Sequence, residues 1–247
     1  MRIALLHARY TLIETARVPI AVMGAVVFPA LTLLFFVLPQ RAIAEDSGAA
    51  TRAVASLAVF AVLNNALFSF ALSIAQDREQ PWDPYLRTLP VRAASRVFGH
   101  VLASAVLGVA AVIPVVVLGA LLTAARATPL GLVGAAAALV VAGIPFALAG
   151  ICIGYAMTSR GASAIVQVVM FGLAFGGGLF FQPTTFAPWL DAVSRVLPSR
   201  QARDLVVFAV QGGTLDLWTW IGIVAWSAAL LALALVLYRR DEGRRFR

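Results

Sequence analysis

The chain has 247 residues, of which 62% are hydrophobic and 12% are charged, and its mean hydropathy is +0.93. Soluble domains are about half apolar and about a quarter charged, so this composition excludes an ordinary soluble protein and predicts a single integral membrane domain over residues 1–247. The formal net charge is +8, but all 19 basic residues are arginines in segments that flank apolar stretches, which indicates membrane insertion and not a surface for nucleic acid.

The first 17 residues have the pattern of an amphipathic helix. Ile3, Leu6, Tyr10 and Ile13 recur at helical spacing, with charged residues between them. We expect residues 1–17 to lie as a helix at the inner membrane interface, among the lipids of that leaflet. The alternative is an extended cytoplasmic start to the first membrane span.

Six stretches are long and apolar enough to cross the hydrocarbon core, which needs about 20 residues. They are Val18–Leu38, Ala53–Ala75, Val97–Leu122, Leu130–Ala156, Ser163–Phe181 and Leu217–Tyr238. With the N-terminus inside, 13 of the 19 arginines fall on the inner side, which predicts that both termini, including the tail 239–247, are cytoplasmic. We therefore expect an all-α membrane protein with six transmembrane helices. The alanine-rich, lysine-free usage is typical of a GC-rich bacterium, and so of a bacterial cell (inner) membrane.

A compact polar island, residues 76–96, separates the second and third stretches. Pro81 and Pro84 fix the start of a short helix and Pro90 ends it. Aromatic and aliphatic side chains form an apolar face on this helix, and charged residues surround it. Such an insert between spans is typical of a docking surface for a soluble partner. The alternative is a solvated loop whose arginines only fix the topology.

Two spans carry residues that could line a pathway. Asn64 and Asn65 lie near the middle of the second span, where an amide needs a partner. A structural hydrogen bond between helices explains such an amide as well as a substrate contact does. The other candidates share aromatic or weakly polar side chains and are Phe68, Gln167, Met170, Phe171 and Phe175. Their alternative role is packing or contact with lipid.

Residues 182–213 are too long for a tight connection and show helical periodicity. We expect two short amphipathic helices there, separated at Pro198, with Ser199 capping the second. Neither is long enough to cross the membrane, so the pair is predicted to dip into the outer leaflet as a re-entrant hairpin. Asp191 and Arg195 stand one turn apart and could form a surface ion pair.

Several chemistries are excluded by what the sequence lacks. A P-loop needs a lysine at the phosphates, and this chain has none. The spans carry no ionisable residue at mid-depth, which disfavours a proton-coupled carrier and a membrane-embedded lipid enzyme. A single cysteine, Cys152, allows no disulfide within the chain, and His7 and His100 lie far apart, so we expect no metal and no cofactor bound by this chain.

The island and the hairpin together resemble the permease subunits of ABC-2-type ATP-binding cassette exporters. In the island the match lies in Arg78-Glu79 and in Tyr85–Val91. In the hairpin it lies in Pro183, Pro188–Leu190, Leu197-Pro198 and Asp204. Gln80-Pro81-Trp82 stands where the family commonly has Gly-Thr, so the start of the short helix is expected to differ.

The resemblance implies a permease that moves a hydrophobic or amphipathic substrate (a drug, a lipid or a glycan-linked molecule) out of the cytoplasm or inner leaflet. Two permease chains, identical or paralogous, would pair, and two copies of a separate cytoplasmic ATPase would carry ATP and Mg²⁺. The island would be the coupling helix, and spans two and five would border the pathway. The coupling residues would be Arg78, Glu79, Trp82, Asp83, Tyr85, Leu86, Arg87, Leu89 and Pro90. The alternative is a membrane scaffold or assembly protein that recruits a soluble partner and transports nothing.

Overall fold

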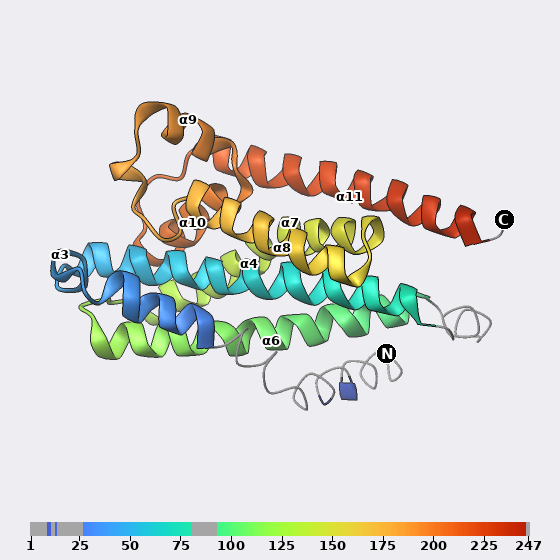
Figure 1. Cartoon of the computed structure of the whole chain (residues 1–247). Helices are drawn as coiled ribbons and strands as arrows, with labels where there is room; N and C mark the ends of the chain where they lie inside the picture. Colours follow the sequence, from blue (N-terminus) through green and yellow to red (C-terminus); the bar gives the residue numbers. More distant parts are fainter. Residues whose placement is uncertain (1–8, 11–12, 14–26, 81–92, 246–247) are drawn as a thin grey trace.

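The computed structural model describes residues 9–10, 13, 27–80 and 93–245, and every regular element in these ranges is a helix. The long helices run side by side along one axis (Figure 1). The predicted interfacial helix lies outside the described residues, apart from Arg9, Tyr10 and Ile13, all of which are exposed. Residues 81–92 of the island also lie outside them.

The first described helix is the apolar segment Val27–Val37, whose second half is the π-helix η1 (Leu33–Val37). It is followed by α3 (Arg41–Ala44), α4 (Ser47–Glu79), α6 (Ala93–Leu122), α7 (Pro129–Ala156), α8 (Ser159–Gly176), the 3₁₀ helix η2 (Pro183–Thr185), α9 (Pro188–Val196), α10 (Pro198–Gln211) and α11 (Leu217–Arg245). Five of these, α4, α6, α7, α8 and α11, have the length and composition to cross a membrane. Together they make the chain a multi-pass membrane protein.

The six predicted spans are recovered only in part. The first, Val18–Leu38, is described only from residue 27, and its visible helix is shorter than a span. The predicted fifth span, Ser163–Phe181, is shifted: α8 begins at Ser159 and ends at Gly176. The chain turns there because Gly178 adopts a φ of +70°, a conformation that favours glycine.

Side-chain caps start three of the spanning helices. Asp46 accepts a hydrogen bond from the backbone of Ala49 at 2.6 Å at the start of α4. Thr128 accepts one from Gly131 at 3.0 Å, and Pro129 follows it in the first position of α7. At α8 the cap is Thr158. Each cap satisfies a backbone N–H that a helix cannot pair internally.

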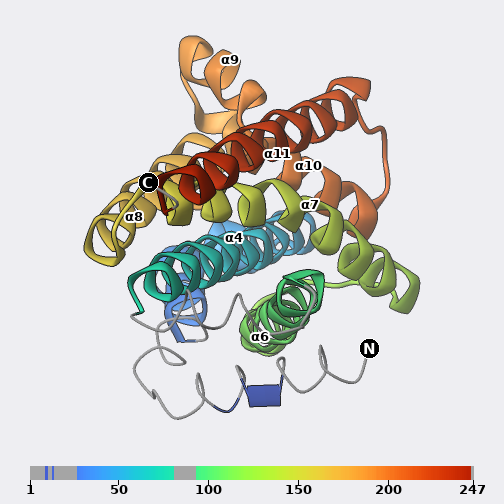
Figure 2. The ribbon, with the colours of Figure 1, turned by 90° about the vertical axis from the view of Figure 1, so that its right-hand side faces the viewer.

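α4 is the central helix of the bundle (Figure 2). It packs against α6, α7, α8 and α10, and Phe60, Leu63 and Leu67 are fully buried along it. α7 approaches it closely through Gly150 and Gly154: a Cβ on Gly154 would lie 2.8 Å from the Cβ of Ile74. The glycines of the fourth span therefore support close helix packing.

α9 and α10 occupy the predicted hairpin segment, and Arg195 lies 2.8 Å from Asp191. The predicted cap at Ser199 is wrong. α10 begins one residue earlier at Pro198, without a side-chain cap, because proline suits the first helical position. The Ser199 hydroxyl instead donates to the carbonyl of Leu173 at 2.7 Å and ties α10 to α8.

Candidate functional site

The end of the bundle where α4 ends and α6 begins is called here the loop end, and the opposite end, which carries α9 and α10, is called the hairpin end (Figure 1). Of the nine predicted coupling residues, Arg78 and Glu79 are described, and the other seven lie in residues 82–90, outside the described ranges. The loop end is thus visible through the last two residues of α4.

Arg78 makes its contacts within the chain. Its Nε donates to Oδ1 of Asp241 on α11 at 2.9 Å, and its Nη1 donates to the carbonyls of Gly154 at 2.9 Å and Met157 at 3.2 Å. Its guanidinium also lies 5.9 Å from the ring centroid of Tyr155. One arginine thus connects α4 with α7 and α11.

Glu79 points to the start of α8. Its carboxylate accepts hydrogen bonds from both the backbone N–H, at 2.9 Å, and the hydroxyl of Ser159, the first residue of α8. The Arg78-Glu79 pair thereby sets a positive charge at the C-terminus of α7 and a negative charge at the N-terminus of α8. Both signs complement the helix dipoles.

Two of the three predicted pathway residues on α4 are buried, and one of these two serves helix packing. Asn64 and Asn65 are 6% and 7% exposed. The amide of Asn65 donates to the backbone carbonyl of Ser104 on α6 at 2.9 Å and lies 3.3 Å from its hydroxyl. The structural alternative thus accounts for Asn65. Phe68 is half-buried against the core.

The predicted residues on α8 divide between two faces. Met170 is buried in the core, whereas Gln167, Phe171 and Phe175 are exposed, with Phe171 at 37% and Phe175 at 44%. Gln167 has no hydrogen-bond partner among the described residues. The seven candidates therefore do not converge on one cavity: they form a buried group around α4 and an exposed face on α8.

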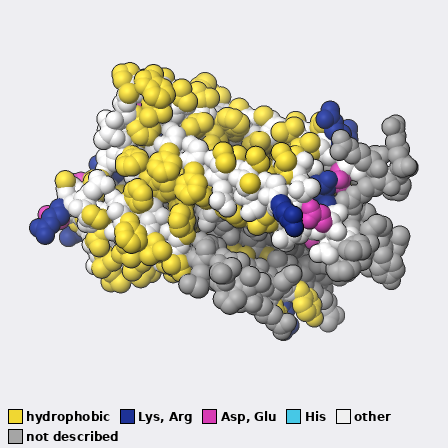
Figure 3. Space-filling model, viewed as in Figure 1, with side chains coloured by type: hydrophobic (Ala, Val, Ile, Leu, Met, Phe, Trp, Pro, Cys, Tyr) yellow, Lys and Arg dark blue, Asp and Glu magenta, His cyan; other side chains and the backbone are white. Residues whose placement is uncertain are grey.

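Aromatic rings extend this exposed face of α8. Phe171 meets Phe28 edge-on at 6.4 Å between ring centroids, and Phe175 meets Phe180 at 4.9 Å and stacks on Phe181 at 6.1 Å. Figure 3 shows hydrophobic side chains over much of the side of the bundle seen in that view. We call the surface formed by Gln167, Phe171 and Phe175 the α8 face.

Charged residues at the hairpin end form a network between helices. Arg200 lies 3.2 Å from Asp191 on α9 and 2.9 Å from Asp204 on its own helix. Arg203 is buried; it donates to the hydroxyl of Ser56 on α4 at 3.0 Å and to Asp204 at 3.0 Å. Burial lowers the pKa of Arg203, and the hydrogen bond from Arg195 lowers the pKa of Asp191.

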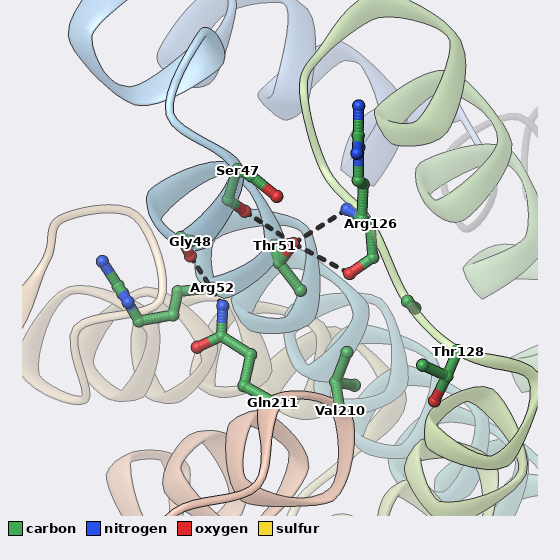
Figure 4. Close-up of a pocket in the computed structure, with 9 residues that line it drawn as sticks. Ser47, Gly48, Thr51, Arg52, Arg126, Thr128, Val210 and Gln211 are labelled. Carbon is green, nitrogen blue, oxygen red and sulfur yellow. Dashed lines mark hydrogen bonds between the residues drawn. The ribbon is translucent and has the colours of Figure 1, made fainter.

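A hollow of about 510 Å³ lies at the hairpin end between α4, the segment before α7, and α10 (Figure 4). Its polar groups bind one another: Thr51 exchanges hydrogen bonds with the backbone of Arg126, and Gln211 donates to the carbonyl of Gly48 at 2.8 Å. The guanidinium groups of Arg52 and Arg126 point away from each other in Figure 4. The hollow is therefore a packing junction and not a convergent binding site.

Three residues of these networks escaped the sequence analysis. Asp241 lies in a tail dominated by arginine, Ser104 in an apolar span, and Arg203 among other charges of the hairpin. None stands in a motif, because each acts through a partner far away in sequence. Cys152 is buried, and the described residues hold no group of three or more potential metal ligands.

The comparisons with known proteins agree on the kind of molecule this is. The profile of the ABC-2 type transporter family matches residues 5–210, most of the chain. A protein of Bacillus subtilis (strain 168), described as "Putative transport permease YvfS", is 20% identical over 188 residues, which cover 76% of this chain and 77% of that protein. The chain is thus a transmembrane permease, and it belongs to the ABC-2 type transporter family.

Proposed function

We infer that the chain is the membrane-spanning half of an ATP-driven exporter. Two permease chains pair in the membrane, and each binds one cytoplasmic ATPase that carries ATP and Mg²⁺. The loop end and both termini lie in the cytoplasm, and the hairpin end lies outside. The substrate is hydrophobic or amphipathic and leaves from the cytoplasm or the inner leaflet.

The α8 face carries the proposal. Gln167 is the ninth of the 18 residues of α8, so its amide lies near the middle of the span. Gln167 has no hydrogen-bond partner within ranges 27–80 and 93–245, and an amide left without a partner in hydrocarbon costs several kcal/mol. A face that holds such an amide suits a second permease chain or a wetted pathway better than lipid tails. The phenylalanines beside it suit an uncharged, amphipathic substrate.

Cysteine crosslinking tests the pairing. In a Cys152→Ala background, Gln167→Cys is expected to give a crosslinked dimer in native membranes, because the α8 face would meet its copy. The matched control is Ala162→Cys, since Ala162 is a fully buried residue of the same helix and should not crosslink. Equal yields at both positions, or no dimer at Gln167→Cys, would contradict the pairing.

Reconstitution tests the transport itself. The permease is purified in mild detergent with its soluble partner, and ATP hydrolysis and substrate efflux are measured in proteoliposomes. The double variant Tyr85→Ala/Arg87→Ala is expected to insert normally and to lose efflux coupled to ATP. Unchanged efflux in this variant would show that the assigned coupling helix is wrong. A partner without any nucleotide site would favour the scaffold alternative.

A further inference from the structure

The contacts of Arg78 link the end of α4, where the island starts, to two other helices, α7 and α11. Besides Nε, its Nη2 also lies close to Oδ1 of Asp241, at 2.8 Å. Tyr155, beneath the guanidinium, meets Tyr238 of α11 edge-on at 5.6 Å. The interaction of Arg78 with Asp241 joins residues that are 163 positions apart in sequence. The group Arg78, Glu79, Ser159 and Asp241 is called the loop-end junction.

The junction is built into the fold and is more than a surface ion pair. The Asp241 side chain is only 7% exposed and that of Arg78 only 23%, so water screens the pair poorly. The carbonyls of Gly154 and Met157 lie at the end of α7, where no further helical N–H reaches them. Arg78 satisfies both and so caps α7 from a neighbouring helix.

Arg78 and Glu79, which are adjacent at the end of α4, contact different helices. Arg78 holds the end of α7 and, through Asp241, the end of α11. Glu79 holds the first residue of α8. Arg78 and Glu79 lie in the first part of the island, two and one residues before Gln80, so a push on the rest of the island would reach these helices at their ends.

We propose that the loop-end junction transmits movement of the island to α8 and α11, with Asp241 as the positioning residue that keeps Arg78 in place. This proposal rests on the proposed function, in which the ATPase moves the island. It adds α11, whose apolar length is otherwise exposed along much of its surface, to the helices that respond. Without Asp241, Arg78 and the adjoining Glu79 would no longer be held in position at the end of α4, and the island would move without carrying α8 and α11 with it.

The test uses the permease–ATPase complex in proteoliposomes. In Asp241→Asn, which keeps the size of the side chain and removes its charge, ATP hydrolysis is expected to persist while the substrate moved per ATP falls about fivefold. Asp241→Glu should retain most of the coupling. The matched control is Arg240→Gln, which removes a charge from an exposed neighbour and should leave the ratio unchanged.

A second readout separates transmission from a loss of folding. In the Cys152→Ala/Gln167→Cys background, the crosslinking yield is compared between nucleotide-free and ATP-trapped complexes. A yield that changes in this background but stays constant with Asp241→Asn supports the junction. A full change with Asp241→Asn overturns it. A yield that never changes, even with Asp241 present, contradicts the proposed function first.

The double variant Arg78→Gln/Asp241→Asn covers the case in which Asp241→Asn fails to fold. It leaves no unpaired buried charge, so it should fold where the single variant does not. The proposal expects the double variant to hydrolyse ATP with the same fall in substrate per ATP. Wild-type coupling in a folded double variant would show that the junction only stabilises the helices.

Discussion

Asn65 illustrates how one polar side chain serves packing inside a membrane helix. Its amide is buried between α4 and α6 and donates to the carbonyl of Ser104. That carbonyl belongs to a helix and already accepts the bond of its own helix turn, so the amide adds a second donor. In hydrocarbon such an amide has few other partners.

Asn65→Ala is therefore expected to lower the free energy of unfolding by about 1 kcal/mol, since hydrogen bonds between membrane helices contribute about 0.6–1.7 kcal/mol. The midpoint of thermal unfolding in detergent checks this. Ser104→Ala is the milder control, because it removes only the hydroxyl at 3.3 Å and keeps the backbone acceptor. If the Asn65→Ala variant unfolds at the same midpoint as the wild type, the hydrogen bond contributes nothing to stability.

At the scale of helices, α4 and α7 approach each other through glycine. A Cβ on Gly154 would also lie 2.9 Å from the carbonyl oxygen of Ala71, a backbone atom that cannot move aside. Gly150 stands likewise against the carbonyls of Ala66 and Leu67. The two helices therefore fix their separation at these positions, and the carbonyl of Gly154 itself binds Arg78 of the loop-end junction.

Gly154→Ala should cost about 1–3 kcal/mol of stability, because overpacking a close helix contact forces the helices apart. Gly172→Ala is the control: it adds the same methyl group on α8, where nothing lies within 4 Å. Thermal unfolding of the two purified variants makes the comparison. Equal midpoints would mean that α7 can move away from α4 without cost.

The two hairpin helices are attached to the bundle differently. α10 is tied to α4 by the buried Arg203 and to α8 by Ser199. The end of α9 is held by hydrogen bonds that Gln201, Trp218 and Trp226 donate to its last carbonyls, whereas its first turn is held to α10 by the ion pair of Asp191 with Arg200. Arg200→Ala should thus raise hydrogen exchange of the amides in α9 several-fold and leave α10 protected. Equal changes in the two helices would show that they move as one unit.

The ion pairs of the Asp191 carboxylate with Arg195 and Arg200 depend on pH in a defined way. Because hydrogen bonding lowers the pKa of Asp191 from its usual value, the carboxylate favours the folded state above the unfolded pKa of about 3.9. That contribution is lost only as the pH falls through the lowered folded pKa. Protection factors of α9 should therefore stay constant from pH 7 to about pH 4 and fall below it. Protection factors of α9 that already fall near pH 6 would show that a group other than Asp191 holds α9 in place.

At the scale of the whole molecule, the arginine distribution predicts the orientation of the bundle. All connections at the loop end share one side of the membrane, and those at the hairpin end share the other (Figure 1). The predicted cytoplasmic position of both termini follows from the larger number of arginines at the loop end. Under the proposed function, this orientation would place the loop end where a cytoplasmic ATPase could bind it.

Labelling of single cysteines checks the orientation. In the Cys152→Ala background, Ala127→Cys at the hairpin end should react in intact cells with a membrane-impermeant maleimide. Gln80→Cys at the loop end should react only after permeabilisation, although both positions are exposed. The reversed pattern would place the termini outside and remove the basis for a cytoplasmic partner at the island.

The sequence alone determined the class of the protein and most of the span limits. Apolar length is a local property: α6 ends at the predicted Leu122, α7 at Ala156, and α11 begins at Leu217. The motifs of the island and the hairpin indicated the family whose profile matches residues 5–210. The absence of lysine excluded a P-loop in this chain.

Only the tertiary structure decided which side chains meet. A membrane span is apolar all round, so periodicity does not separate a face toward protein from a face toward lipid. For that reason the sequence grouped the buried Met170 with the exposed Phe171 on α8. It predicted a coupling role for Arg78 and gave no sign of Asp241, which the fold brings beside it, because contacts between distant residues depend on how the helices pack and not on any local pattern.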